Sequence, residues 1–171
     1  MNLENGERLE DLQCHGLKII QNKDLYTFTS DSVILANFIK TKAKDTAVEI
    51  GAGCGVISIL VQAKNKVEKI YAFELQREMQ QLCKKNLELN NLNDKITLIC
   101  DDVKNFEKYI KKESVDVVFS NPPYFKPTNF DQSMIKKIAK EDATLPLEVL
   151  VEVAGSMLRF GGTFYCCYSA E

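Results

Sequence analysis

Residues 48–56 read Val-Glu-Ile-Gly-Ala-Gly-Cys-Gly-Val, with a glycine at every second position after a short apolar run. Thr46–Ile50 is typical of a short buried strand, and Val56–Lys64 is typical of a helix that follows it. Glycine allows a tight turn between two such elements and lets backbone N–H groups approach a ligand closely. We therefore expect a ligand-binding strand–turn–helix unit, with glycines that serve packing alone as the alternative.

Strand and helix patterns alternate after this turn. Further strands are expected at Lys69–Phe73, Ile96–Cys100, Val115–Ser120 and Thr163–Tyr168. Helices are expected between them at Arg77–Asn90, Lys104–Lys111 and Thr144–Phe160, the last ended by Gly161-Gly162. This alternation predicts an α/β fold with a doubly wound, mostly parallel sheet, in which ligands bind beyond the carboxyl ends of the strands.

Residues 1–45 are expected to form a hairpin and a helix ahead of this core, within one domain that spans the chain. Two β-prone runs in Leu17–Phe28 flank a polar turn at residues 21–24, which indicates the hairpin. Ser30 or Asp31 would cap the helix. Its apolar face would consist of Ile34, Leu35, Phe38 and Ile39.

The composition is that of an ordinary globular domain. Hydrophobic residues make up 45% and charged residues 27% of the chain, and the net charge is −2. Because the overall charge is nearly neutral, a nucleic acid could be held only by a local basic surface. Neither a membrane span nor a signal peptide is visible, so we expect a cytoplasmic protein without membrane association. Six cysteines without metal-binding spacing and a single histidine predict no metal site.

Acidic residues follow the next two strands. Glu74 lies about twenty residues past the glycine turn, where a carboxylate can accept both ribose hydroxyls of an adenosine. Val56 stands where a dinucleotide-binding turn would have its third glycine, which disfavours a dehydrogenase. Asp101-Asp102 could accept a hydrogen bond from an adenine amino group, or could simply form a turn or a helix cap.

The run Val48–Gly55, with Glu74 and Asp102, resembles the successive binding motifs of the class I S-adenosylmethionine (SAM)-dependent methyltransferases. The resemblance implies a Rossmann-like fold and SAM as the cofactor. It also implies the roles of the individual side chains: the methionine end would be held by Glu49, Gly51 and Gly53, the ribose by Glu74, and the adenine by Asp102.

The aspartate assignment departs from the family pattern, which usually has a small residue at position 101. Either Asp101 or Asp102 could therefore contact the cofactor. We assign the contact to Asp102, because the apolar Val103 follows it.

The motif Ser120-Asn121-Pro122-Pro123-Tyr124 stands at the end of the fourth predicted strand of the core. Two prolines set a rigid turn there. The Asn121 side-chain oxygen and the Pro122 carbonyl can each accept one hydrogen of an exocyclic amino group, which aims the nitrogen lone pair at a methyl donor. Tyr124 can stack on an unstacked base. A proline-rich turn with no catalytic role is the alternative.

This motif resembles that of methyltransferases acting on planar nitrogens, namely adenine-N6, guanine-N2 and protein-glutamine enzymes. With Tyr26–Ala36 and the adjoining Phe125 it is similar to the tRNA(Val) adenine-N6 methyltransferases. That resemblance implies a tRNA substrate methylated at an anticodon-loop adenine and contacted by Tyr124, Phe125 and Lys126, with Asn121 also beside the cofactor. Lysines within residues 125–140 would contact phosphates or form ordinary solvated surface.

Three alternatives stay open: a protein-glutamine N5-methyltransferase, an rRNA guanine-N2 methyltransferase, and a non-catalytic SAM- or RNA-binding module. Glutamine enzymes usually carry a helical N-terminal domain, whereas about 45 residues precede the first core strand here. Members of the resembling family normally continue through two more strands, so we expect residues 46–171 to be a core that lacks its last C-terminal strands. We expect a monomer.

Overall fold

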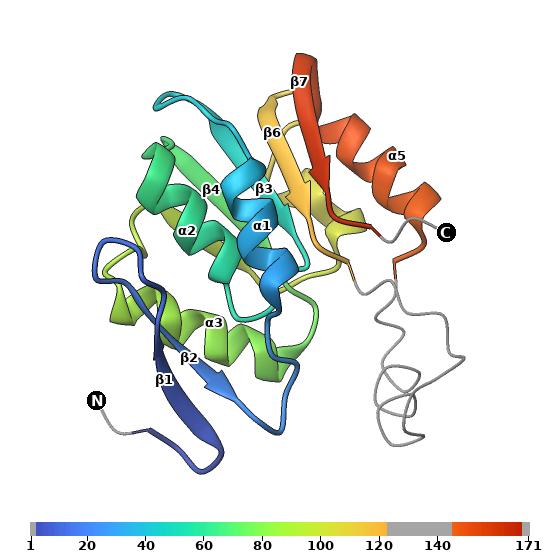
Figure 1. Cartoon of the computed structure of the whole chain (residues 1–171). Coiled ribbons are helices and arrows are strands. Elements are labelled where there is room, and N and C mark those ends of the chain that lie inside the picture. The colour runs from blue at the N-terminus through green and yellow to red at the C-terminus, as the bar shows by residue number, and fades with distance from the viewer. Residues whose placement is uncertain (1–2, 123–144, 169–171) are drawn as a thin grey trace.

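The computed structural model of this chain describes residues 3–122 and 145–168. Its centre is a five-stranded sheet with helices on both faces, and a two-stranded hairpin lies at one side (Figure 1). The sheet consists of β3 (Thr46–Ile50), β4 (Lys69–Phe73), β5 (Ile96–Ile99), β6 (Val115–Ser120) and β7 (Leu158–Cys166). These strands run in the order β5-β4-β3-β6-β7, and every neighbouring pair is parallel. The predicted doubly wound α/β fold is confirmed.

The strand order reverses between β3 and β6. The chain moves outward from β3 to β5 and then returns to place β6 on the other side of β3. Ile50, at the end of β3, pairs with Phe73 of β4 and with Ser120 of β6. Three central strands therefore end at the same level, at the switch point where sheets of this kind bind ligands.

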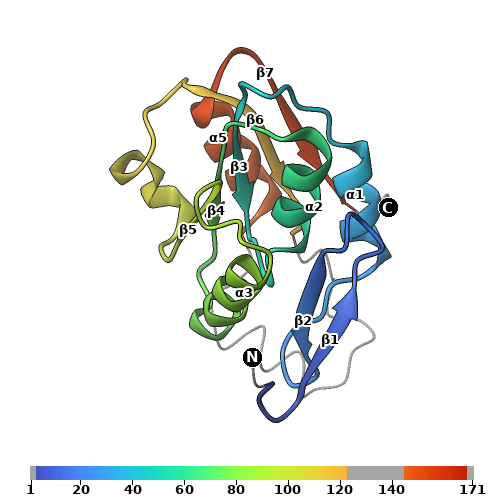
Figure 2. The same ribbon diagram turned by 90° about the vertical axis from the view of Figure 1, so that its left-hand side faces the viewer.

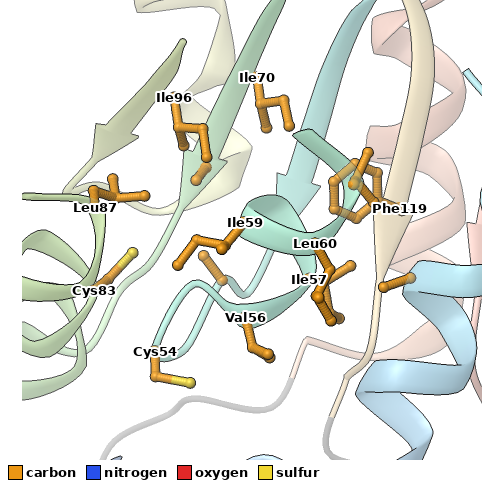
Figure 3. Packing of buried hydrophobic residues seen from close by; sticks show 14 of the residues in the cluster. Cys54, Val56, Ile57, Ile59, Leu60, Ile70, Cys83, Leu87, Ile96 and Phe119 are labelled. Carbon is orange, nitrogen blue, oxygen red and sulfur yellow. The ribbon is translucent and has the colours of Figure 1, made fainter. Parts of the chain in front are cut away.

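The helices cover the two faces of the sheet separately. Helices α1 (Ser30–Phe38), α2 (Val56–Asn65) and α3 (Arg77–Leu89) share one apolar cluster with inward-facing strand residues such as Ile70 and Phe119. Figure 3 shows part of this cluster around Leu60 and Phe119. The opposite cluster is formed by the 3-10 helix η1 (Val103–Lys108), by α5 (Leu147–Met157) and by the alternate strand residues.

The predicted hairpin was placed wrongly. Its strands are β1 (Glu7–Asp11) and β2 (Lys18–Asn22), which pair antiparallel, and the connection between them runs through residues 12–17. Left-handed backbone at Gln13, His15 and Gly16 forms that connection, so residues 21–24 do not turn the hairpin. A strand reading Glu-Arg-Leu-Glu-Asp is too polar for its pattern to reveal it.

The predicted apolar face of α1 is confirmed for Leu35 and Ile39 and wrong for its other two residues. Ile34 and Phe38 are 64% and 68% exposed. The buried face consists of Leu35 and the adjoining Ile39, as predicted, together with Ser32 and Ala36. The N-cap of α1 is Thr29, without a side-chain hydrogen bond, and not Ser30 or Asp31.

The last predicted helix is shorter than expected, and β7 begins directly after it. Helix α5 has Pro146 as its N-cap and ends at Met157. The pair Gly161-Gly162 lies inside β7, where the pairing with β6 shifts register between Val115 and Val117. Gly161 has φ +78 within this irregular stretch. The glycines therefore serve a bulge and not a helix end, and the expected cap at Thr144 lies outside the described residues.

Helix α3 lies beside the hairpin (Figure 2). Two asparagines of the α3 segment bond the hairpin and hold it against the core. The Asn86 Oδ1 accepts from the Ile20 N–H at 2.7 Å, and its Nδ2 donates to the carbonyls of Ile20 at 3.0 Å and Cys54 at 2.9 Å. One turn later, Asn90 bonds both backbone groups of Lys18. Asn86 is fully buried, so it connects the hairpin to the glycine turn without access to water.

We expect Asn86→Ala to lower the free energy of unfolding by about 2–4 kcal/mol, because it leaves three buried backbone groups unpaired. Asn90→Ala is the matched control. It removes similar bonds at a partly exposed position, where water can replace them, so its loss should stay below about 1 kcal/mol. Urea unfolding followed by circular dichroism measures both, and equal losses would contradict the role given to Asn86.

Candidate active site

The glycine turn joins β3 to α2 at the level where the central strands end. The N–H groups of Gly51 and Ala52 both donate to the Phe73 carbonyl, at 3.0 and 2.9 Å. Gly55 has φ +86, and a Cβ added there would lie 2.7 Å from the Cys83 sulfur, so packing against α3 requires a glycine. Gly51 has φ +74 but meets nothing within 4 Å. Packing therefore explains Gly55, whereas Gly51 faces open space.

Glu74 directly follows β4, as predicted, and its carboxylate lies against the glycine turn. Its Oε2 accepts from the Gly53 N–H at 2.7 Å and its Oε1 from the Gln76 N–H at 2.8 Å. Glu74 thus orders the glycine turn from the end of β4.

Glu49 is almost completely buried, with 1% of its surface exposed. Its Oε2 accepts from both the backbone N–H and the hydroxyl of Ser58 in α2, whereas its Oε1 is buried without a hydrogen-bond partner in the protein. Burial raises the pKa of this carboxyl to about 8, with a smaller contribution from the charge of Glu74, against the lowering effect of the Ser58 hydrogen bonds. A ligand that donates a hydrogen bond would satisfy Oε1.

Asp101 and Asp102 both interact with η1. Asp101 accepts from the side chains of Asn105, Tyr109 and Lys108, and these hydrogen bonds, that of Asn105 foremost, lower its pKa to about 2. Asp102 is the N-cap of η1 and accepts from the Lys104 N–H at 2.9 Å. The cap predicted as the alternative role is therefore present. Asp101 is occupied by three side chains, whereas among the described residues the Asp102 carboxylate interacts with Lys104 alone, whose Nζ also lies 3.5 Å from Oδ2. Asp102 therefore has the fewer partners of the two.

Asn121 follows β6 at the same edge of the sheet. Its Nδ2 donates to the Ser32 hydroxyl of α1 at 3.0 Å, and its Oδ1 is buried without a partner in the protein. The preceding Ser120 hydroxyl donates to the Ile50 carbonyl at 2.8 Å, which fixes the end of β6 against β3. Pro122 is buried. The predicted Tyr124, Phe125 and Lys126 lie outside the described residues, as does Pro123.

The structure thus brings the predicted residues of β3, β4 and β6 to one edge. Two unpartnered buried acceptors, Glu49 Oε1 and Asn121 Oδ1, come from adjacent strands there. Buried acceptors of this kind are rare unless a ligand or water completes them. Sequence reasoning missed Ser58 and Ser32, which hold these two side chains. Ser32 lies within Tyr26–Ala36, a stretch that was identified by its family resemblance and by a helix cap at Ser30 or Asp31, without a role for Ser32.

Within residues 3–122 and 145–168, no helix is long and apolar enough to cross a membrane. The same residues contain no cluster of three or more His, Cys, Asp or Glu side chains arranged to hold a metal ion.

Comparison with known proteins gives a family match over most of the chain. A family model described as the methyltransferase small domain matches residues 27–166. A tRNA1(Val) (adenine(37)-N6)-methyltransferase from Shewanella sediminis is 30% identical over 138 residues, which cover 79% of this chain and 56% of the relative. A relative from Methanocaldococcus jannaschii, named as a candidate protein N5-glutamine methyltransferase, is 35% identical over 124 residues, covering 72% of this chain and 58% of the relative.

Among solved structures, TYW2 of M. jannaschii in complex with AdoMet has a TM-score of 0.59 and 17% identity, covering 83% of this chain and 59% of that one. At this identity the likeness concerns the fold. The chain spans only 56% and 58% of the lengths of the two curated relatives above.

The raised pKa of Glu49 predicts a pH-dependent stability. Between about pH 4.5 and 8 the folded chain keeps a proton on Glu49 that the unfolded chain has lost. The stability that this neutral carboxyl contributes is therefore fully present below pH 4.5. It declines as the pH rises above 4.5 and is lost once the pH has risen through 8. Glu49→Gln removes this titration, so the variant should gain stability relative to wild type as pH rises, by at most about 1.4 kcal/mol per pH unit.

Urea unfolding at several pH values between 5 and 9 checks this expectation, with each variant compared with wild type at the same pH. Ser30→Ala, at an exposed position, is the control and should follow wild type throughout. If the free energies of unfolding of Glu49→Gln and wild type differ by the same amount at every pH, Glu49 is ionised in the folded chain across this range.

Proposed function

Since this chain belongs to the methyltransferase small-domain family, we propose that it transfers the methyl group of SAM to the exocyclic N6 of an adenine in tRNA. The observation that carries the proposal is the hydrogen bonding of the Asn121 side chain. Its amide nitrogen is engaged by Ser32, and its oxygen is a buried acceptor without a partner at the ligand-binding edge of the sheet.

The cofactor is SAM, and the residues at this edge fit it. Its methionine end carries an ammonium group, which suits the unpartnered Glu49 Oε1 and the open space beside Gly51. The backbone of the turn at Gly53 would also line the methionine end of the cofactor. Glu74, at the end of β4, would accept from the ribose hydroxyls, and Asp102 from the adenine amino group. Bound SAM supplies an electrophilic methyl on a sulfonium.

The protein's part in the reaction is to orient the acceptor nitrogen. An exocyclic amino group conjugated to a ring is a poor nucleophile, because its lone pair is delocalised. Hydrogen bonds from its two hydrogens to Asn121 Oδ1 and to the Pro122 carbonyl draw the nitrogen toward a tetrahedral form and direct the lone pair outward. Methylation makes this nitrogen acidic, so the proton is lost afterwards and no strong base is needed first. The rate enhancement then comes from positioning and fixed dipoles.

Adenine in tRNA is favoured by two features. The chain resembles the tRNA(Val) adenine-N6 enzymes in Tyr26–Ala36 as well as in the Asn121 motif, and the relative from S. sediminis is named for that activity. Tyr124 and Phe125 would supply aromatic faces for a flipped base, and Lys126 a charge for the backbone. Protein glutamine is the second candidate, because the M. jannaschii relative shares 35% identity and an amide also carries two hydrogens on a planar nitrogen.

The cofactor site can be tested by Glu74→Ala. We expect SAM to bind roughly ten- to a hundred-fold more weakly, because hydrogen bonds to a charged acceptor are worth about 1.5–3 kcal/mol. Glu78→Ala, at an exposed position in the first turn of α3, is the matched control and should leave the affinity unchanged. Isothermal titration calorimetry measures both, and wild-type affinity in Glu74→Ala would remove Glu74 from the site.

The substrate can be tested by the product. The chain is incubated with methyl-labelled SAM and either total tRNA or a cell extract depleted of RNA, and the products are digested to nucleosides or amino acids. We expect N6-methyladenosine from tRNA, identified by mass spectrometry. Methylated glutamine would transfer the assignment to the second candidate, and a methylguanosine would refute the adenine assignment while leaving the methyltransferase activity in place.

A further inference from the structure

One contact of the Asn121 side chain is not explained by cofactor or substrate binding. Its Nδ2 donates to the hydroxyl of Ser32, 89 residues earlier in the chain, at 3.0 Å. Ser32 is 4% exposed and lies in the first turn of α1. The end of β6 is therefore joined to an element that lies outside the alternating strand–helix core.

The contact matters because a carboxamide has two different ends. Its oxygen accepts hydrogen bonds and its nitrogen donates them. Only the oxygen can receive a hydrogen of a substrate amino group, and a rotated amide would oppose one N–H with another. A hydroxyl can donate or accept. In this structure the Ser32 hydroxyl accepts from Nδ2, so the contact holds the carboxamide in the orientation in which Oδ1 is left available. That oxygen is the buried acceptor without a partner in the protein.

Ser32 itself is held in place from two directions. Its helix buries Leu35, Ala36 and the adjoining Ile39 in the core, so α1 cannot rotate without exposing them. The segment before the helix is fixed by Gln21 of the hairpin, whose Oε1 accepts from the Phe28 N–H at 3.1 Å. The hydroxyl therefore stands at a fixed point facing the end of β6.

The buried face of α1 is otherwise apolar. A hydroxyl on such a face costs stability unless it is hydrogen-bonded. In many helices a buried serine bonds back to a carbonyl of the preceding turn. Here the hydrogen bond that the Ser32 side chain makes is to Asn121. A purely structural helix position would be better filled by alanine, as at Ala36.

We propose that Ser32 is a positioning residue, which holds the Asn121 carboxamide in the single orientation that can accept a hydrogen from the substrate amino group. This role rests on the proposed methyl transfer to a planar amino nitrogen. Ser32 would act through Asn121 and touch neither cofactor nor substrate.

The test combines two substitutions. Ser32→Ala should lower kcat about tenfold, equivalent to about 1.4 kcal/mol, while the Kd for SAM stays within twofold of wild type. Asn121→Asp places two equivalent acceptor oxygens at the site, so orientation no longer matters. Adding Ser32→Ala to Asn121→Asp should therefore change kcat by less than twofold. Ser30→Ala, on the exposed side of the same helix turn, is the control and should keep the wild-type rate.

A second measurement is independent of turnover. The two side-chain amide protons of Asn121, assigned by NMR in the protein without ligand, should shift in Ser32→Ala but not in Ser30→Ala. Unchanged Asn121 amide signals would overturn the proposal, even if Asn121→Asp proved inactive. An equal loss of rate from Ser32→Ala in both the wild-type and Asn121→Asp backgrounds would also overturn it, because the effect would then be general packing.

Failure of the proposed function and failure of the positioning role give different results. If wild type binds SAM but yields no methylated nitrogen with tRNA or protein, the proposed function is wrong and the positioning role falls with it. If wild type methylates its substrate and Ser32→Ala does so at the same rate, only the positioning role is wrong.

Discussion

The common level at which β3, β4 and β6 end is the constraint on which the site depends. Ile50 pairs with Phe73 on one side and Ser120 on the other, so the next residue of each strand leaves the sheet at the same edge. Those residues are Gly51, Glu74 and Asn121. Because side chains alternate between faces along a strand, a slip of one residue would turn a buried set outward. The apolar packing that fixes this register thereby also fixes the distances among the functional groups.

Hydrogen-bond acceptors are concentrated at this edge of the sheet. Glu49, Glu74 and Asp102 follow or lie near the ends of three neighbouring strands, and Asn121 adds an amide oxygen beside them. Such a site favours a ligand that carries positive charge and several N–H or O–H groups, as SAM does. The burial that leaves Glu49 neutral in the free protein has a matching consequence, because an arriving ammonium group would favour its ionised form.

The sequence predicted the central strands well, and it failed where contacts between distant segments decide the structure. The predicted bounds of β3, β4 and β6 are confirmed, since strands buried on both faces are short apolar runs that need no partner to be recognised. The strand Glu7–Asp11 was missed because pairing with β2 stabilises it against its polar composition. The face of α1 was misjudged in part, because the polar Ser32 is buried beside Leu35, where it bonds Asn121 from a distant segment, and no local pattern can reveal that contact.

The side chains of Asn86 and Asn90 bond the backbone of β2 where a neighbouring strand would otherwise do so. These side-chain amides supply donors and acceptors to Lys18 and Ile20 at the spacing of alternate strand residues, along the edge of β2 that β1 does not cover. That edge is consequently closed to strand addition by another molecule. Because Asn86 also bonds the Cys54 carbonyl, one side chain links the hairpin to the glycine turn. Hairpin, helix and turn should therefore open as one cooperative unit, and hydrogen exchange of their amide protons should report similar free energies of opening.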